Sequence, residues 1–279
     1  MTRPLIILTN DDGIDSPGLA ASAAALDPLG DLLIVAPNVQ QSGMGRSMPP
    51  WNDGRLTETT ISANGQTWRA YRANASPAQA VQHALLELID RHPALVVSGI
   101  NYGENIGVAV TVSGTVGAAL EAAAFGVPAL AVSLQTDPAH HMTNDASVDF
   151  RVAAYFTRLF AARWLNTEPL PDVDVLKIDI PQDATPDTPW RITRLERRNY
   201  YRPLRPARST LDGEGHIGYE LNPDLTDDQD SDASVLLRGM ISVTPLTLDF
   251  TSRIGPDVLH RILDRAGAGE PLRRDQAAR

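Results

Sequence analysis

The sequence of 279 residues contains no cysteine. This absence excludes disulfide bonds, thiolate zinc sites and cysteine nucleophiles, so any bound metal ion must have oxygen or imidazole ligands. The chain also lacks an apolar run of the roughly 18 residues that a membrane-spanning helix needs, and no basic and apolar leader precedes its first apolar segment. We therefore expect a cytoplasmic protein without a membrane partner.

Positive charge is scarce as well. Lysine and arginine together number 24 against 34 aspartates and glutamates, which gives a formal net charge of −10. Such an excess of negative charge repels nucleic-acid backbones and anionic membrane surfaces. The composition thus predicts no nucleic-acid partner.

Short apolar runs alternate with longer segments of helical pattern along the chain. This alternation is typical of βαβ units, so the fold class is predicted to be α/β with a mostly parallel sheet. The expected central strands are residues 5–8, 32–36, 95–98, 129–133 and 175–180. The expected helices are residues 19–29, 78–91, 116–125 and 148–165.

One hairpin is expected outside this alternation. Residues 55–72 alternate polar and apolar side chains around Asn64-Gly65, a dipeptide that strongly favours a tight hairpin turn. We expect this hairpin at the edge of the sheet.

The composition changes near Pro181, where proline, aspartate and arginine become frequent. We expect residues 181–239 to form an ordered extension or arm, with a strand at 219–221 and a solvated acidic loop at 224–232. A strand at 240–243 and a helix at 256–266 follow, and the polar residues after them are expected to fray. We predict a single domain over residues 1–279, with a core made of residues 1–180 and 240–266.

The pentapeptide Thr9-Asn10-Asp11-Asp12-Gly13 ends the first apolar run with two adjacent carboxylates. In open α/β sheets ligands bind at the carboxyl ends of the strands, so Asp11 and Asp12 are expected at the rim of a crevice. Ser16 before Pro17 predicts a helix start that is capped by the serine hydroxyl. The segment is therefore a candidate active site on the first strand.

Three further polar segments stand at the same edge of the predicted sheet. A flexible loop at 36–47 contains Ser42, and the glycine- and asparagine-rich segment 98–107 contains Asn101 and Asn105. Ser113-Gly114-Thr115 opens a helix, where free backbone N–H groups, two hydroxyls and the positive end of the helix dipole form a candidate phosphate site.

Two carboxylates beside a phosphate site require a cation. A phosphate dianion about 5 Å from each carboxylate would be repelled by roughly 3 kcal/mol per charge pair at an effective dielectric constant near 20. Two carboxylates, a serine hydroxyl and an asparagine carbonyl form a hard-oxygen set, which suits Mg²⁺, Mn²⁺ or Ca²⁺ rather than zinc or copper. We predict a bound divalent ion that bridges the acids and the phosphate.

These motifs resemble, in this order, those of the SurE (survival protein E) family of stationary-phase nucleotidases. The family patterns T-N-D-D-G, A-P-x-x-x-x-S-G, V-S-G-I-N-x-G-x-N-x-G and S-G-T-V-x-A-A occur between Thr9 and Ala119. Residues 128–133 continue the match, and Val243-Thr244-Pro245-Leu246 resembles the closing strand of the family.

The resemblance implies both a fold and an activity. The fold would be a Rossmann-like three-layer sandwich with a C-terminal β-hairpin arm, swapped between subunits to build a homodimer or homotetramer. The activity would be that of a divalent-metal-dependent phosphomonoesterase, a 5′-nucleotidase that hydrolyses nucleoside monophosphates to nucleoside and phosphate. Nucleoside 3′-monophosphates and short polyphosphate are further candidate substrates.

Carried over position by position, the resemblance assigns Asp11, Asp12, Ser42 and Asn101 as the ligands of one divalent ion per subunit. The ion would be Mg²⁺ or Mn²⁺, and Ca²⁺ could also occupy the site. The resemblance assigns the substrate phosphate to Asn105, Ser113, Gly114 and Thr115. Asn10 and Gly13 would support the acids from behind. Asp11 and Asp12 would be the catalytic residues, one of which orients or deprotonates the attacking water.

The chain departs from the family pattern at three places. Gln79 replaces the aspartate of G-T-P-x-D, and Val112 stands where a ring often precedes S-G-T-V. N-x-N-x-P becomes Lys177-Ile178-Asp179-Ile180-Pro181. These changes bear on the walls and supports of the substrate site, and so on substrate preference rather than on the chemistry.

Two alternatives stay open at this point. A haloacid-dehalogenase-like phosphatase would use Asp11 as a covalent nucleophile, but Gly13 stands where its second carboxylate is needed. A non-catalytic nucleotide-binding regulatory protein would keep the crevice without turnover. The pair His140-His141 also suggests a metal site, but no carboxylate lies at ligand spacing, and we expect both side chains to be solvent-exposed.

Overall fold

The computed structural model describes residues 3–266 except 169, 223 and 226–227. The chain divides into two compact units, Met1–Leu248 and Asp249–Arg279. Helix α6 (Pro256–Ala266) belongs to the second unit and has the bounds predicted from the sequence. The predicted fraying after this helix lies outside the described residues, and the assignment of residues 256–266 to the core stays a prediction.

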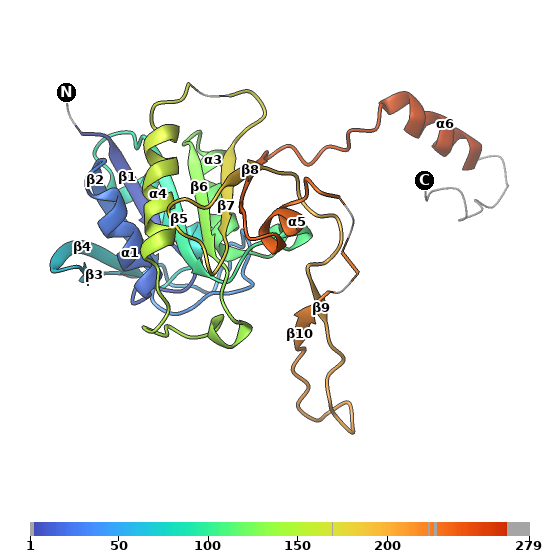
Figure 1. The fold of residues 1–279 in the computed structure, drawn as a ribbon, viewed down its shortest axis with the longest axis horizontal. Helices are drawn as coiled ribbons and strands as arrows, with labels where there is room; N and C mark the ends of the chain where they lie inside the picture. The colour runs from blue at the N-terminus through green and yellow to red at the C-terminus, as the bar shows by residue number, and fades with distance from the viewer. Residues whose placement is uncertain (1–2, 169, 223, 226–227, 267–279) are drawn as a thin grey trace. The chain divides into compact units, whose positions relative to one another are not determined.

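The first unit is built on a nine-stranded sheet with the order β3-β4-β2-β1-β5-β6-β7-β11-β8 (Figure 1). Neighbouring strands are parallel except for the pairs β3–β4 and β7–β11, which confirms the predicted α/β fold with a mostly parallel sheet. The strands are β1 (Leu5–Thr9), β2 (Asp31–Pro37), β3 (Leu56–Ala63), β4 (Gln66–Ala73), β5 (Leu95–Tyr102), β6 (Ala129–Leu134), β7 (Val175–Ile180), β8 (Trp190–Ile192) and β11 (Ile241–Leu246).

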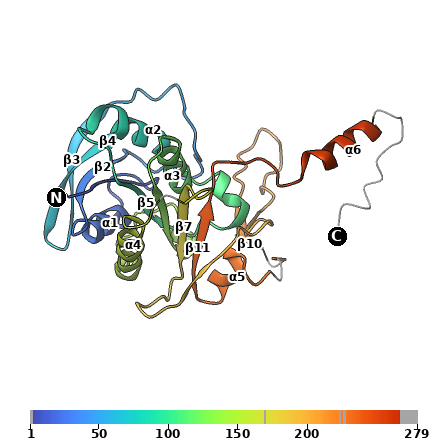
Figure 2. The same ribbon diagram turned by 90° about the horizontal axis from the view of Figure 1, so that it is seen from above.

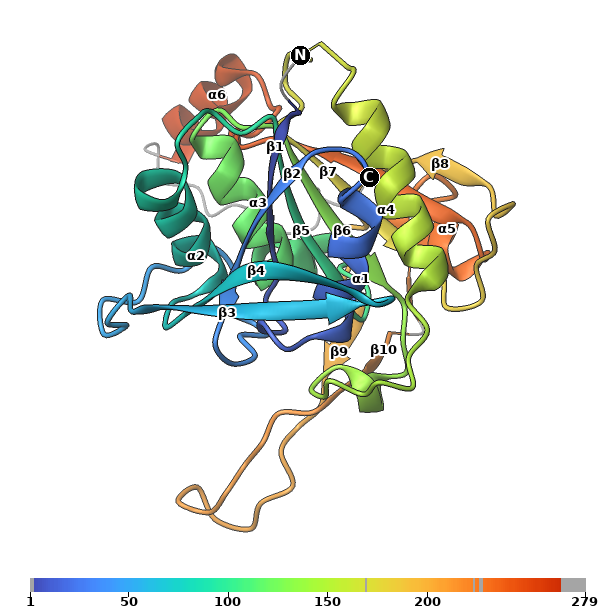
Figure 3. The ribbon, with the colours of Figure 1, turned by 90° about the vertical axis from the view of Figure 1, so that its left-hand side faces the viewer.

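Helices cover both faces of this sheet (Figure 3). One face carries α1 (Pro17–Leu26) and α4 (Arg151–Trp164), and the other carries α2 (Pro77–His83) and α3 (Gly114–Ala124). Side chains alternate along β1, so Ile6 and Leu8 enter the apolar core under α1 and α4 while Ile7 enters the core under α2 and α3. The predicted three-layer sandwich is thereby confirmed. No helix of the described chain is long and apolar enough to cross a membrane.

The predicted edge hairpin consists of β3 and β4. The two strands pair in register from Leu56 opposite Ala73 to Ala63 opposite Gln66. Asn64 and Gly65 both have positive φ angles, of 52° and 77°, as a two-residue hairpin turn requires.

The start of α1 corrects one prediction. The helix begins at Pro17, as expected, but the Ser16 hydroxyl makes no capping hydrogen bond and has no hydrogen-bond partner among the described residues. Proline has no N–H and has a φ angle already suited to a helix, so the first turn needs the cap less.

The segment between β7 and β11 forms an ordered extension of the first unit. Strand β11 lies beside β7 (Figure 2), and β8 joins the sheet on the other side of β11. Strands β9 (Tyr201–Pro203) and β10 (Tyr219–Leu221) pair antiparallel in an arm that projects from the sheet (Figure 1). Helix α5 (Asp232–Leu237) follows. The strand predicted at 219–221 is confirmed, and the exchange of the arm between subunits stays a prediction.

Candidate active site

The acidic pentapeptide lies where the strand order of the sheet reverses. Strand β1 has β2 on one side and β5 on the other, and the sheet extends from this pair in both directions. At such a point the crevice outside the carboxyl ends of the strands is the usual ligand site of α/β sheets. Asp11 and Asp12 follow β1, and Asn101 lies at the end of β5. The topology therefore brings the predicted acids and the predicted asparagine to one place.

Asp11 is buried and is held by the start of α3. The Thr115 hydroxyl donates a hydrogen bond to Oδ1 of Asp11 at 2.5 Å. A Cβ atom on Gly114 would lie 2.8 Å from Oδ2 of Asp11, so only glycine lets the helix approach the carboxylate this closely. Burial raises the pKa of Asp11 to about 6, although hydrogen bonds from Thr115 and the backbone at Gly114 oppose the shift.

Asp12 is held by groups from two other segments. The backbone N–H of Tyr102 donates to its Oδ2 at 3.1 Å, and Gln40 Nε2 donates to its Oδ1 at 3.3 Å. Burial and the negative charge of Asp11 raise the pKa of Asp12 well above its usual value. Within the described residues neither Asp11 nor Asp12 forms an ion pair with a lysine, arginine or histidine. Among the residues that the structure describes, no positively charged side chain is thus paired with either buried carboxylate.

Asn10 closes the turn that carries the two acids. Its Nδ2 donates to the backbone oxygen of Gly13 at 3.0 Å, and its Oδ1 accepts from the Gly13 N–H at 3.2 Å. One side chain therefore fixes both ends of the Asp11-Asp12 segment, which supports the role predicted for Asn10 and Gly13.

The two other predicted metal ligands lie on neighbouring loops. The backbone N–H of Gln41 donates to the backbone oxygen of Asp11 at 2.7 Å, which holds this loop against the acids. Ser42 is the next residue of the loop and is exposed. Asn101 is buried, and its Nδ2 donates to the backbone oxygens of Tyr102 and Gly103 at 3.0 and 2.6 Å. Both amide hydrogens of Asn101 are then used, so its Oδ1 is the atom that could bind an ion.

These donors fit a hard divalent cation. Within the described ranges no group of three or more histidines, aspartates or glutamates could hold a metal ion. A site here would need the hydroxyl of Ser42 and the amide oxygen of Asn101 besides the two carboxylates. Such an oxygen-only set suits Mg²⁺, Mn²⁺ or Ca²⁺.

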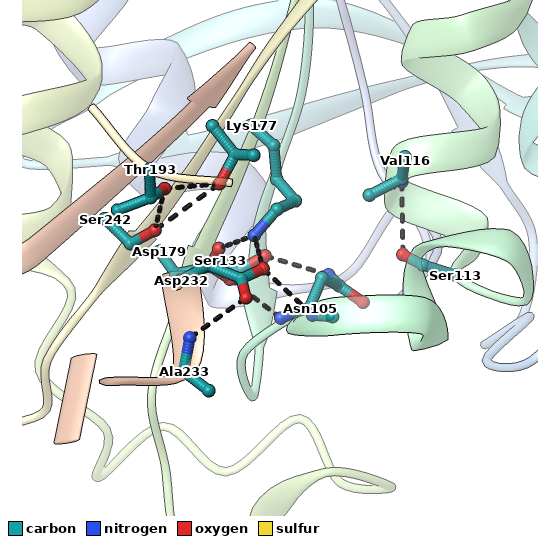
Figure 4. Close-up of polar contacts among 12 residues, drawn as sticks. Asn105, Ser113, Val116, Ser133, Lys177, Asp179, Thr193, Asp232, Ala233 and Ser242 are labelled. Atoms are coloured by element: carbon teal, nitrogen blue, oxygen red, sulfur yellow. Dashed lines mark hydrogen bonds and ion pairs between the residues drawn. The ribbon is translucent and has the colours of Figure 1, made fainter. Parts of the chain in front are cut away.

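The predicted phosphate-binding residues lie at two places, the start of α3 and the loop after β5. Ser113 caps α3 by accepting a hydrogen bond from the Val116 N–H at 3.1 Å (Figure 4). Gly114 and Thr115 contact Asp11, a role for the Thr115 hydroxyl that the sequence did not indicate. Asn105 lies on the loop after β5, where its Nδ2 donates to Ser133 Oγ at 2.8 Å.

A buried ion network that the sequence analysis missed supports Asn105 (Figure 4). Lys177 Nζ contacts the carboxylate of Asp179 and lies 3.1 Å from Oδ2 of Asp232, and all three side chains are fully buried. The backbone N–H of Asn105 donates to Oδ1 of Asp179 at 2.7 Å, and that of Gly107 donates to Oδ2 of Asp232 at 2.9 Å. Burial alone would lower the pKa of Lys177, but attraction to the two carboxylates outweighs it and raises the pKa. The lysine therefore stays charged.

This network corrects the prediction of a solvated acidic loop at 224–232 at its last residue, whereas Asp224 and Asp230 are exposed as predicted. Asp232 is fully buried because the ammonium group of Lys177 needs negative partners inside the protein. The same contact gives a structural reason for the departure at 177–179, where a lysine and an aspartate replace two asparagines of the family pattern.

Gln79, which replaces the aspartate of the family pattern, makes local contacts at the start of α2. Ser76 Oγ accepts from the Gln79 N–H at 3.1 Å, and Gln79 Oε1 accepts from the Ser76 N–H at 3.1 Å. This reciprocal pair is a capping box that fixes the start of α2. Gln79 therefore supports the fold there.

The expected exposure of His140-His141 is wrong. Both side chains are half-buried, and His140 Nδ1 lies 3.1 Å from a carboxylate oxygen of Asp145. The backbone oxygen of His141 accepts from Gln40 Nε2 at 2.7 Å, so the side chain that binds Asp12 also binds this turn. The turn lies against the active site because of this long-range contact, which has no local sequence signal.

A hollow on the surface lies away from these residues. It has a volume of about 940 Å³ and is lined by residues of α1, β3, α4 and the segment before α4. None of the predicted site residues lines it. The clustering of buried acids, rather than the size of a hollow, locates the site.

The fold and the site define a Rossmann-like α/β protein with a candidate site for a divalent cation and a phosphate group. The family model described as "Survival protein SurE" matches residues 6–202. The chain belongs to the SurE family.

Individual relatives align over most of the chain. The chain is 38% identical to a 5′-nucleotidase SurE of Methanothrix thermoacetophila, over 89% of this chain and 94% of that protein. It is 37% identical to a 5′-nucleotidase SurE of Thermococcus gammatolerans, over 92% of this chain and 95% of that protein. A crystal structure of a SurE protein from Aquifex aeolicus is similar with a TM-score of 0.71 and 29% identity, over 94% of this chain and 100% of that one.

Proposed function

We propose that this protein is a 5′-nucleotidase, which hydrolyses nucleoside monophosphates to nucleoside and phosphate with the aid of a divalent metal ion. Relatives that bear the name 5′-nucleotidase SurE align over about nine-tenths of the chain, which supports the substrate class. The observation that carries the proposal is the buried pair Asp11 and Asp12, which lies beside the start of α3 and forms no ion pair within the described part of the chain.

Asp11, Asp12, Ser42 and Asn101 would hold one Mg²⁺ or Mn²⁺ ion per subunit, a set that Ca²⁺ also fits. The bound ion would neutralise charge on the phosphoryl group and make a nearby water more acidic. The protein contributes rigidity, because Thr115 and Tyr102 fix one oxygen of each carboxylate. The ligands would therefore need little rearrangement when the ion binds.

Groups on the loop after β5 and at the start of α3 would bind the phosphoryl group. Asn105 uses one amide hydrogen on Ser133, which leaves the second for a phosphoryl oxygen. Ser113 would donate its hydroxyl hydrogen, and the positive end of α3 favours an anion there. One of the two aspartates would orient the attacking water or accept its proton.

The direct test is phosphate release from 5′-AMP by the purified protein, with added Mn²⁺ or Mg²⁺ and with EDTA. We expect turnover with the metal and none with EDTA. Asp11→Asn should reduce turnover at least about a hundredfold, because it removes a charged ligand and a candidate base. Asp15→Asn is the matched control, because this nearby acid is exposed and pairs with Arg72 at 2.8 Å.

The same assay separates the alternatives. A nucleotide-binding protein without turnover would release no phosphate under either condition. A haloacid-dehalogenase-like enzyme would form a trapped beryllofluoride complex on Asp11, which the proposed mechanism does not form. Full activity of Asp11→Asn would contradict the proposal itself. The phosphate-release assay should also be run with nucleoside 3′-monophosphates and short polyphosphate, which are further candidate substrates.

We also infer from the family resemblance that the protein is a cytoplasmic homodimer or homotetramer. The arm of β9 and β10, which projects from the sheet, is the element that would be exchanged. Light scattering of the full chain, compared with a variant shortened at the arm, tests this assembly.

A further inference from the structure

Three aromatic side chains from separate segments meet beside the acid pair. Tyr201 begins β9, Tyr219 begins β10, and His141 follows the 3₁₀ turn η3 (Pro138–His140). The rings of His141 and Tyr219 are 6.1 Å apart and nearly parallel, at 15°. The Tyr201 ring lies 5.2 Å from that of Tyr219 and 6.0 Å from that of His141. These three residues are called the aromatic cluster below.

Two contacts place the aromatic cluster next to the active site. Gln40 Nε2 donates to Oδ1 of Asp12 at 3.3 Å and to the backbone oxygen of His141 at 2.7 Å. A Cβ atom on Gly103 would lie 2.6 Å from His141 Nε2, so the imidazole packs against the loop that follows Asn101. The cluster therefore lies at the rim of the site, on the side of the arm.

The rings are fixed at their polar ends and open on part of their surface. The Tyr201 hydroxyl donates to Oε1 of Glu104 at 2.7 Å, and the Tyr219 hydroxyl lies 3.1 Å from His141 Nδ1. Tyr219 is 44% exposed, and Tyr201 and His141 are half-buried. Aromatic faces that are held in place and partly open to solvent form a platform on which a flat ring can stack.

Attachment of the arm to the core does not account for this exposure. The neighbouring Tyr200 already supplies an attachment, because it is buried in an apolar group with Ile106, Ala233 and Leu236. An anchoring residue gains stability by burial, as Tyr200 does, whereas Tyr219 keeps much of its surface open. The open face of Tyr219 is therefore available for contact with a bound ring.

We propose that Tyr201, Tyr219 and His141 form the subsite that stacks on the nucleobase of the substrate. The inference rests on the proposed function, since the phosphate at the acid pair is what brings the base to the rim. Stacking uses the π face that all bases share. The subsite therefore selects nucleotides over sugar phosphates that lack a base, with little choice among the bases.

The test compares 5′-AMP with ribose 5-phosphate, which carries the same phosphate and sugar without the base. Tyr219→Ala should raise KM for 5′-AMP about tenfold, a value within the range found for loss of one base–aromatic stack. It should leave kcat/KM for ribose 5-phosphate unchanged. Tyr219→Phe keeps the ring and should stay within about twofold of the wild type for both substrates. Tyr155→Ala is the matched control, because Tyr155 on α4 is exposed to a similar extent, at 46%.

Binding of adenosine, measured by calorimetry, keeps this inference separate from the proposed function. We expect Tyr219→Ala to weaken adenosine binding about tenfold and Tyr155→Ala to leave it unchanged. Equal adenosine affinities in the wild type and Tyr219→Ala would overturn the subsite, as would equal effects on 5′-AMP and ribose 5-phosphate. Absence of turnover in the wild type would instead contradict the proposed nucleotidase, and the adenosine measurement would still decide the role of the rings.

Discussion

The hydroxyl of Thr115 donates a hydrogen bond to Oδ1 of Asp11 at 2.5 Å, across 104 positions of sequence. The donor lies in the first turn of α3 and the acceptor directly after β1, so this bond joins the two elements of the site that carry opposite charge. Together with the backbone at Gly114, it fixes the orientation of the Asp11 carboxylate.

Replacement of Thr115 by valine should lower the activity, since valine has a similar shape but no hydroxyl. A hydrogen bond to a charged group is worth about 1.5–3 kcal/mol, so we expect kcat/KM for 5′-AMP to fall about tenfold or more. Thr115→Ser should restore most of the activity. Thr157→Val is a control for the loss of a buried hydroxyl, because Thr157 donates to the Ala153 carbonyl far from the acids. Equal losses in both valine variants would contradict a specific role for Thr115.

Lys177 should be essential for stability. Lys177→Met would leave Asp179 and Asp232 buried without their cation, and breaking a buried ion network in this way typically costs about 3–5 kcal/mol. Urea denaturation should show this loss as a lower midpoint. Arg69→Ala removes one member of an exposed pair with Glu58 and should leave the midpoint unchanged. A Lys177→Met protein as stable as the wild type would show that the network contributes nothing net.

Asp179 should make stability depend on pH. Burial raises the pKa of Asp179 from 3.8 to about 6, although Lys177 and the N–H of Asn105 oppose the shift, while Asp232 adds to it. Because the folded pKa exceeds the unfolded one, the native state binds the proton more tightly between about pH 4 and pH 6. This contribution to stability is complete at low pH and is lost as the pH rises through about 6.

Asp179→Asn should remove this part of the pH dependence, because asparagine keeps an oxygen acceptor for Asn105 but does not titrate. The measurement is the free energy of unfolding at several pH values, in EDTA so that metal binding does not contribute. The difference between the two proteins should grow in favour of the variant as the pH rises from 4 to about 6. A difference that is constant with pH would argue against the raised pKa.

The sheet and the acids could be predicted from the sequence because their signals are local. The run at 5–8 and the following Asp11-Asp12 show a buried strand and its polar end within a few residues. Strand ends that point to one edge then bring Asn101 near the acids by topology alone. The structure confirms this layout, and it also gives the hairpin around Asn64-Gly65 at the edge of the sheet.

The contacts that refine the site could not be predicted, because their partners are distant in sequence and have no periodic pattern. Asp232 looked like one member of an acidic run, and only the fold shows that it reaches Lys177. No pattern in the sequence indicates that the Gln40 side chain binds both Asp12 and the turn at His141. The Ser16 hydroxyl failed as a cap because Pro17 already sets the helix start.

The contact between Lys177 and Asp232 has a consequence for how the first unit unfolds. Lys177 belongs to the central sheet and Asp232 to the helix at the end of the extension, so the charge balance of the sheet depends on a distant stretch of chain. If that helix detached, the ammonium group would lose one of its two anionic partners in a dry interior. We therefore expect the extension and the sheet to melt in a single cooperative transition.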